Sequence, residues 1–138
     1  MKDVAYIALG SNLGRRELFL AEARTAIAAL AKTSVVAETE VIETVPIGPV
    51  DQGPYLNQMI AVQTELSPTQ LLYALQEIER SAGRTRSERW GPRTLDLDIV
   101  MFEKQDAAEP GLTVPHPELP NRDFWQRELA QLRAAAVD

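Results

Sequence analysis

Two aspartates in the last third of the chain have the residue type and spacing most suggestive of chemistry. Asp96 and Asp98 alternate with Leu95, Leu97 and Ile99. Alternate side chains of a β-strand share a face, so this spacing predicts both carboxylates on one face, about 7 Å apart, with the apolar residues toward the core. Close carboxylates repel, and hard oxygen ligands suit Mg²⁺ and a polyphosphate. The alternative is an exposed polar face with two solvated acids, or acids neutralised by arginine.

Arginines are concentrated directly upstream of the two aspartates. The stretch 79–93 contains five of them, which are Arg80, Arg84, Arg86, Arg89 and Arg93. A guanidinium presents a planar fork of donors that matches phosphate oxygens, and it stays charged at neutral pH. The chain as a whole has a net charge of −6, so a local basic patch favours a small anionic ligand, with a solvated loop as the alternative. Trp90, in the same stretch, offers a flat surface for a heterocycle.

Three further groups of polar residues are candidates for ligand contacts. His116, the one histidine of the chain, lies between two prolines that stiffen its position and suit a phosphate contact, although a lone loop histidine is commonly structural. Tyr55 and Asn57 share a strand face and would offer an aromatic surface and an amide fork to a planar heterocycle; the alternative is a core tyrosine and a turn asparagine. Gln76 and Glu79 share a helical face, where most such pairs face solvent.

The elements that must position these residues follow from the apolar periodicity. Strands are expected at 4–9, 34–45, 55–65 and 94–103, and helices from about 15 to 30, from Ser67 to about Gly83, and from about 123 to 135. The second helix has a capping box from Ser67 to Gln70. The segment 10–14, which is rich in glycine, is expected to end the first strand.

This β-α-β-β-α-β order predicts an α+β fold, a ferredoxin-like sandwich with an antiparallel sheet, helices packed on one face and an extra C-terminal helix. The length of 138 residues predicts a single domain over 1–138.

Composition narrows the function classes. The chain has no cysteine, which excludes disulfides, thiolate metal sites and thiol nucleophiles and is compatible with the cytoplasm, the expected location. The first apolar run is too short for a signal peptide or a membrane span, so no membrane association is expected. Ferredoxin-like sheets often bind RNA, which makes an RNA-binding module the main alternative. The negative net charge and the lack of an interleaved basic-aromatic motif argue against nucleic acid as a partner.

Residues 89–99, with the sequence RWGPRTLDLDI, resemble the signature of the 6-hydroxymethyl-7,8-dihydropterin pyrophosphokinase family of folate biosynthesis. Segments 10–14, 46–49, 55–57 and 115–117 agree with the family in type and order, and the resemblance covers roughly residues 4–124. It implies an ATP-dependent pyrophosphokinase that transfers pyrophosphate from ATP to the hydroxymethyl group of the pterin and releases AMP. The implied partners are these small molecules, and a monomer is expected.

The resemblance also implies roles for individual residues. Asp96 and Asp98 would bind two Mg²⁺ ions, and Arg84 and Arg93 would steady the transferred phosphates. The ATP side would be lined by Gln76, Arg86, Arg89, Thr113, His116 and Arg122. The pterin would be enclosed by Thr44, Tyr55, Asn57, Trp90 and Phe124, with Glu79 near the junction of the two substrates. After Phe124 the chain departs from the family, because 125–130 has the pattern of an amphipathic helix. A catalytically silent relative is a further alternative, against which the intact acids and arginines argue.

Overall fold

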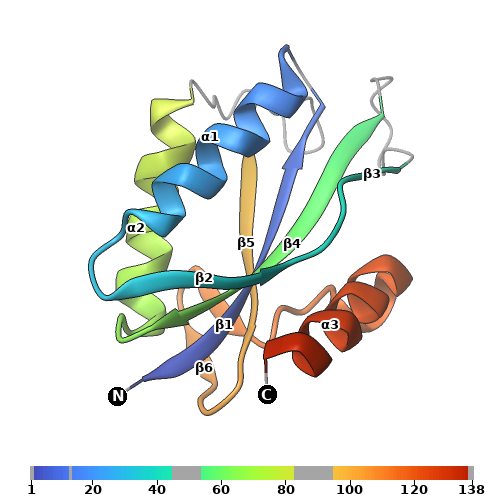
Figure 1. Ribbon diagram of the computed structural model, residues 1–138. Helices are drawn as coiled ribbons and strands as arrows, with labels where there is room; N and C mark the ends of the chain where they lie inside the picture. The colour runs from blue at the N-terminus through green and yellow to red at the C-terminus, as the bar shows by residue number, and fades with distance from the viewer. Residues whose placement is uncertain (1, 13, 45–53, 83–94, 137–138) are drawn as a thin grey trace.

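An antiparallel β-sheet organises the protein, as seen in the computed structural model, which describes residues 2–12, 14–44, 54–82 and 95–136 (Figure 1). In chain order the elements are β1 (Asp3–Ser11), α1 (Arg16–Ala28), β2 (Thr33–Glu38), β3 (Ile42–Thr44), β4 (Tyr55–Thr64), α2 (Pro68–Ser81), β5 (Asp96–Phe102), β6 (Ala107–Glu109), β7 (Leu112–Val114), a 3₁₀ turn (Leu119–Asn121) and α3 (Asp123–Ala136). None of the helices described has the length and apolar run needed to cross a membrane.

The strand order confirms the ferredoxin-like topology. The main sheet runs β2-β4-β1-β5, and β1 is antiparallel to both β4 and β5. Strand β3 pairs with the first residues of β4. Each βαβ crossover therefore skips one position in the sheet, and the two halves interleave. The central strands β1 and β4 are apolar on both sides, as expected of strands that are covered on both faces.

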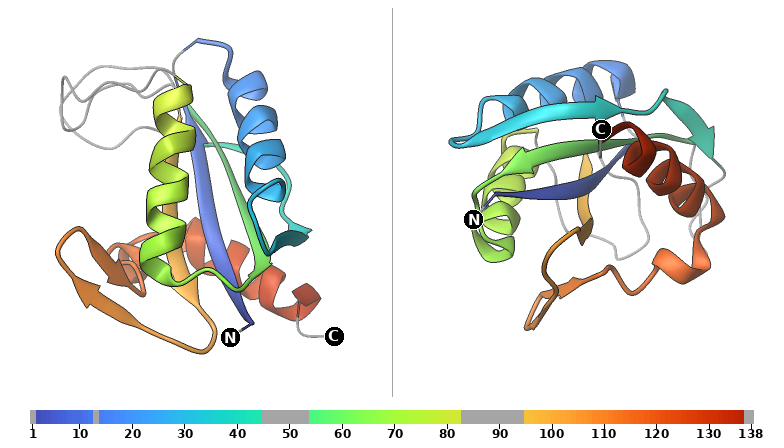
Figure 2. Two further views of the ribbon diagram at one scale, coloured as in Figure 1. Left: turned by 90° about the vertical axis from the view of Figure 1, so that its left-hand side faces the viewer. Right: turned by 60° about the horizontal axis from the view of Figure 1, so that its bottom comes forward.

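Both faces of the sheet are covered, by different helices. Helices α1 and α2 pack on one face, called here the α1/α2 face, where Leu20, Ile27 and Leu71 meet the odd-numbered residues of β1. Helix α3 packs on the opposite face, called here the α3 face, through Trp125 and Leu132 (Figure 2). The sequence pattern predicted the C-terminal helix but not the face that it covers, and this second layer is what completes the core.

Some predicted boundaries are wrong. Strand β1 does not end before Gly10; it continues through Ser11, and Gly10 stays in register with both neighbouring strands. The predicted strand 34–45 is two strands, because the chain leaves the ladder after Glu38. The small β6–β7 hairpin was not predicted. The capping box of α2 is confirmed, with Ser67 and Gln70 each bonding the other's backbone N–H.

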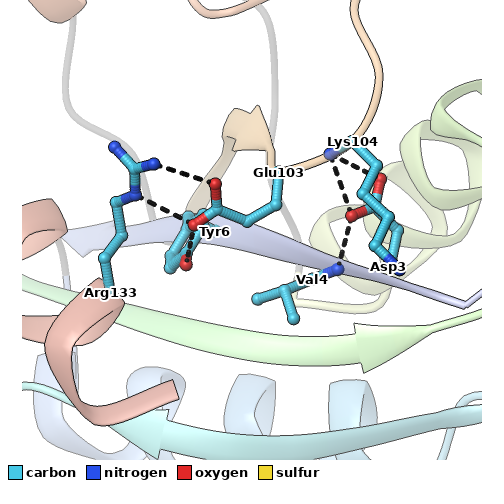
Figure 3. Close-up of polar contacts among 6 residues, drawn as sticks. All are labelled: Asp3, Val4, Tyr6, Glu103, Lys104 and Arg133. Atoms are coloured by element: carbon cyan, nitrogen blue, oxygen red, sulfur yellow. Dashed lines mark hydrogen bonds and ion pairs between the residues drawn. The ribbon is translucent and has the colours of Figure 1, made fainter. Parts of the chain in front are cut away.

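A polar cluster anchors the C-terminal end of α3 to the sheet (Figure 3). The buried Tyr6 of β1 donates its hydroxyl to Glu103 Oε2 at 2.7 Å. Arg133 of α3 donates to both oxygens of the same carboxylate, at 2.9 and 3.0 Å. Burial, followed by the bond to Glu103, raises the pKa of Tyr6 above its usual range, so the phenol stays protonated and keeps donating. Tyr6, Glu103 and Arg133 thus form a clamp between two strands and α3.

Candidate active site

The acid pair lies on the α3 face of β5, as the alternation predicted. Leu95, Leu97 and Ile99 are buried against α1 and α2, whereas Asp96 and Asp98 are half-exposed on the other side. Strand register places Asp96 opposite Gly10 and Asp98 opposite Ala8 of β1. The two acids therefore lie beside the two smallest residues on the α3 face of β1, so little side-chain volume covers the sheet next to them.

Gly10 joins the acid pair to the residues expected to bind a heterocycle. It is in register with Asp96 on one side and with Asn57 on the other, so these three residues form one row across β5, β1 and β4. A Cβ built at Gly10 would lie 3.5 Å from both Asn57 Oδ1 and the Tyr55 ring. Glycine thus leaves the floor between Asp96 and the Tyr55–Asn57 pair open.

Tyr55, Asn57 and Thr44 form the far side of this floor. Thr44 of β3 is the register partner of Tyr55, and its hydroxyl accepts a hydrogen bond from the Asn57 side-chain amide at 2.5 Å. That bond leaves the Asn57 carbonyl oxygen directed toward Gly10. All three side chains are partly exposed, so the arrangement offers an aromatic edge with a hydroxyl and an amide beside it, as a planar ligand with polar edges requires.

His116 stands beside the second aspartate. Its Nε2 lies 3.7 Å from Asp98 Oδ1. Its Nδ1 accepts the backbone N–H of Glu118 at 3.0 Å, which assigns the proton of the neutral ring to Nε2, the nitrogen facing the acid. The backbone N–H of His116 is bound to the Val100 carbonyl of β5 at 2.8 Å. The ring is therefore held against the acid-bearing strand, with a donor directed toward any anion bound there.

Residues at the start of α3 pack against the His116 ring. The buried Trp125 meets the His116 ring edge-on, with 5.0 Å between centroids. The Arg122 guanidinium lies 4.4 Å from the Trp125 ring centroid, and the Phe124 ring lies edge-on to Trp125 at 6.4 Å. Trp125 and Gly10 were not predicted as site residues from the sequence. An aromatic residue next to Phe124 at the start of the helix was the available signal for Trp125, whereas Gly10 needed the strand register.

Three other candidates lie on α2 and β7 and not on the strands of this floor. Gln76 and Glu79 belong to α2, which packs on the α1/α2 face, and Glu79 is buried there with Oε2 accepting the backbone N–H of Leu97 at 2.8 Å. Thr113 is exposed on β7. The candidates Arg84, Arg86, Arg89, Trp90 and Arg93 lie outside the described residues.

The donor set fits magnesium that arrives with a nucleotide. Asp96 and Asp98 offer carboxylate oxygens on one face, and Asp98 keeps 33% of its side chain exposed. Within the described ranges, no group of three or more His, Cys, Asp or Glu side chains forms a cage. Mg²⁺ is commonly held by one or two carboxylates, with the remaining positions filled by substrate phosphates and water. The acid pair offers two carboxylates of the kind that such a site uses.

A ferredoxin-like sandwich with an acid pair, a fixed histidine and an open heterocycle floor on one face defines a class of small-molecule enzymes that handle charged substrates. Comparison with known proteins then specifies the family. Residues 6–134 match the family model of 7,8-dihydro-6-hydroxymethylpterin-pyrophosphokinase, and the chain belongs to this family.

Curated relatives of similar length carry the corresponding name. The 2-amino-4-hydroxy-6-hydroxymethyldihydropteridine pyrophosphokinase of Bacillus subtilis is 42% identical over 132 residues, which are 96% of this chain and 79% of the relative. The Pseudomonas aeruginosa protein of the same name is 44% identical over 127 residues, or 92% and 78% of the two chains.

The fold also matches solved structures. A Plasmodium falciparum HPPK-DHPS structure with pteroate superposes on 88% of this chain with a TM-score of 0.66 at 14% identity. This chain covers 37% of that longer chain, and the match concerns the fold alone.

Proposed function

We propose that this protein transfers the pyrophosphoryl group of Mg-ATP to the hydroxymethyl group of 6-hydroxymethyl-7,8-dihydropterin, giving the pterin diphosphate and AMP in folate biosynthesis. The observation that carries the proposal is the single row Asp96–Gly10–Asn57. This row would serve as a common floor for the proposed metal-nucleotide site and the proposed heterocycle site. Family membership supplies the identity of the two substrates.

The pterin would lie over Gly10. Tyr55 and Phe124 would contact its ring, while Asn57, fixed by Thr44, would read its polar edge. Trp90, which lies outside the described residues, would complete the proposed pocket. This arrangement would place the hydroxymethyl arm on the Asp96 side of the floor, which is the side from which the β-phosphorus must be approached in line.

The triphosphate would lie along the acid pair. Asp96 and Asp98 would hold two Mg²⁺ ions, and the chemistry supplied by such ions would be neutralisation of phosphate charge and a lower pKa of the attacking hydroxyl. His116 would donate from Nε2 to a phosphate oxygen, and Arg122 would add positive charge on the nucleotide side, with Gln76 and Thr113 at its margin. Arg84, Arg86, Arg89 and Arg93 would close over the phosphates. Little covalent chemistry is required of the protein, because pyrophosphoryl transfer depends on positioning and charge neutralisation.

The nucleotide product tests the proposal. Protein mixed with Mg-ATP and the hydroxymethyl-dihydropterin is expected to form AMP and pterin diphosphate in equal amounts, measured by anion-exchange chromatography. ADP as the nucleotide product, or hydrolysis to inorganic phosphate without a pterin product, would contradict it. We further propose a monomer acting in the cytoplasm, which is compatible with the cysteine-free composition; light scattering tests the oligomeric state.

A further inference from the structure

A buried carboxylate on α2 contacts the backbone between the two catalytic acids. Glu79 is only 7% exposed, and its Oε2 accepts the N–H of Leu97 at 2.8 Å. Leu97 is the residue that separates Asp96 from Asp98. The contact crosses from the helix layer to the strand, so it ties the peptide that carries the acid pair to α2.

The position of β5 in the sheet gives this contact its importance. Strand β5 is the last in the order β2-β4-β1-β5, so one side of it has no strand partner within the described sheet. Along an antiparallel strand, the backbone groups of successive residues point alternately toward and away from the partner. The Leu97 N–H is bound by a helix side chain, so it is an outward-pointing group. Glu79 replaces the missing strand at the position between the two acids.

A glutamate at this place is costly for the fold. Glu79 lies near the end of α2, where the helix carries partial negative charge that disfavours a carboxylate. Burial adds a desolvation cost, because the carboxylate leaves water for an interior beside Leu75 and Leu97. An apolar side chain would fill the same space without either cost. The bond from the Leu97 N–H is one interaction that a carboxylate makes here and an apolar residue would not.

We propose that Glu79 is a positioning residue that fixes the segment Asp96–Leu97–Asp98, and through it the affinity of the enzyme for the magnesium-nucleotide complex. The inference rests on the proposed function, because it assumes that the acid pair binds the metal. It differs from the expectation that Glu79 contacts the substrates directly. Residues that orient metal ligands typically change metal affinity or activity roughly 10- to 100-fold when they are replaced.

Three variants separate the possible roles. Glu79→Leu removes the acceptor, and Glu79→Gln keeps an oxygen that can accept the same N–H. Glu77→Leu removes an exposed glutamate from the same helix, 65% exposed and paired with Arg80, and serves as the matched control. Two measurements are made without pterin. One is hydrogen exchange of the Leu97 amide, and the other is calorimetric binding of a non-hydrolysable ATP analogue across a Mg²⁺ titration.

We expect Glu79→Leu to lose both the protection of the Leu97 amide and the binding of the analogue. Glu79→Leu should speed exchange at Leu97 and weaken magnesium-dependent binding of the analogue roughly 10- to 100-fold, whereas Glu79→Gln and Glu77→Leu should keep both. Fast exchange with unchanged binding would mean that Glu79 only protects the strand edge and does not influence nucleotide binding, and this would overturn the proposal. Unchanged exchange in Glu79→Leu, or an effect confined to the KM for the pterin, would also overturn the proposal.

The test remains decisive if Glu79→Leu does not fold or if the protein lacks the proposed activity. Should Glu79→Leu fail to fold, Glu79→Gln still discriminates, because weak analogue binding with a protected Leu97 amide would show that the charge and not the positioning bond is needed. Both measurements omit the pterin and need no turnover. A protein that formed no AMP would therefore refute the proposed function and leave the exchange and binding data independently readable.

Discussion

Gly10 shows how a single missing side chain can define a site. The sequence pattern suggested a strand end at this glycine, but the register places it in the middle of the row that links Asp96 to Asn57. Its φ angle is not what makes glycine valuable here. The benefit is space, because any side chain at this position would project onto the floor that the pterin is proposed to occupy.

Substitution of Gly10 tests this reading. Gly10→Ala adds a Cβ at ordinary contact distance, 3.5 Å from Asn57 Oδ1 and the Tyr55 ring, and is expected to have little effect. Gly10→Val adds two further methyl groups to the floor and should raise the KM for the pterin about tenfold or more, with a smaller effect on ATP. Steady-state kinetics of the two variants is the measurement. Equal pterin KM values for Gly10→Ala and Gly10→Val would mean that the ligand does not approach Gly10.

Glu128 is a second residue whose environment could not be predicted from the sequence. It lies on the buried side of α3, where its Oε2 accepts the Thr39 hydroxyl at 3.1 Å and its Oε1 has no hydrogen-bond partner among the described residues. Burial raises the pKa of Glu128, while the bond from Thr39 and the charge of Arg127 oppose the shift. The protonated form is therefore favoured in the folded state relative to the unfolded chain.

The sign of the pH effect follows from this shift. A carboxyl whose pKa is raised by folding contributes stability at low pH, and that contribution is lost as pH rises from the ordinary value of 4.5 through the raised value. Glu128→Gln should therefore gain stability relative to the wild type as pH rises above about 4.5. Urea unfolding from pH 4 to 8 measures the difference. The exposed Glu22→Gln on α1 is the control, and a pH-independent difference for Glu128→Gln would contradict the argument.

Among the elements, α3 depends most on contacts that no local pattern specifies. Its amphipathic sequence predicted a helix, and the helix is present over Asp123–Ala136. The pattern could not say which face of the sheet would receive it, since that depends on partners about 30 and 130 residues away, Glu103 and Tyr6. By contrast, the start of α2 was predictable, because the Ser67–Gln70 capping box is a local signal.

The clamp of Tyr6, Glu103 and Arg133 makes this dependence measurable. Tyr6→Phe removes a buried hydrogen bond to a carboxylate and should lower the free energy of unfolding by about 1–2 kcal/mol. Arg133→Met should cost about 1 kcal/mol or less, because Arg133 is half-exposed and solvent screens the pair. Tyr73→Phe, at a tyrosine that is 63% exposed on α2, is the matched control. Urea unfolding is the measurement, and equal values for Tyr6→Phe and Tyr73→Phe would refute the clamp.

At the scale of the whole molecule, the lysines lie away from the acid pair. All three lysines of the sequence, Lys2, Lys32 and Lys104, lie at strand ends remote from Asp96. The arginine-rich stretch joins the end of α2 to the start of β5, which is where the acid pair begins. A chain with a net charge of −6 thus has five of its arginines directly before the acid pair in the sequence, where a polyphosphate is proposed to bind.

The division between what was predictable and what was not has a physical origin. The alternation around Asp96 and the order of elements depend on neighbours in sequence, so the fold class and the shared face of the two acids followed from the chain alone. The row through Gly10, the support of His116 by Trp125 and the bond from Glu79 to Leu97 depend on register and on contacts between layers. Such contacts are fixed only when the whole sheet and its two covering layers are assembled.

The central claim is that Asp96 and Asp98 together hold divalent cations shared with a nucleotide. A titration with Mn²⁺, followed by electron paramagnetic resonance in the presence of a non-hydrolysable ATP analogue and the pterin, counts those ions directly. The wild-type protein is expected to bind two ions per chain, and the folded double variant Asp96→Asn, Asp98→Asn should bind fewer and more weakly. The same number of ions with the same affinity in both proteins would contradict the account.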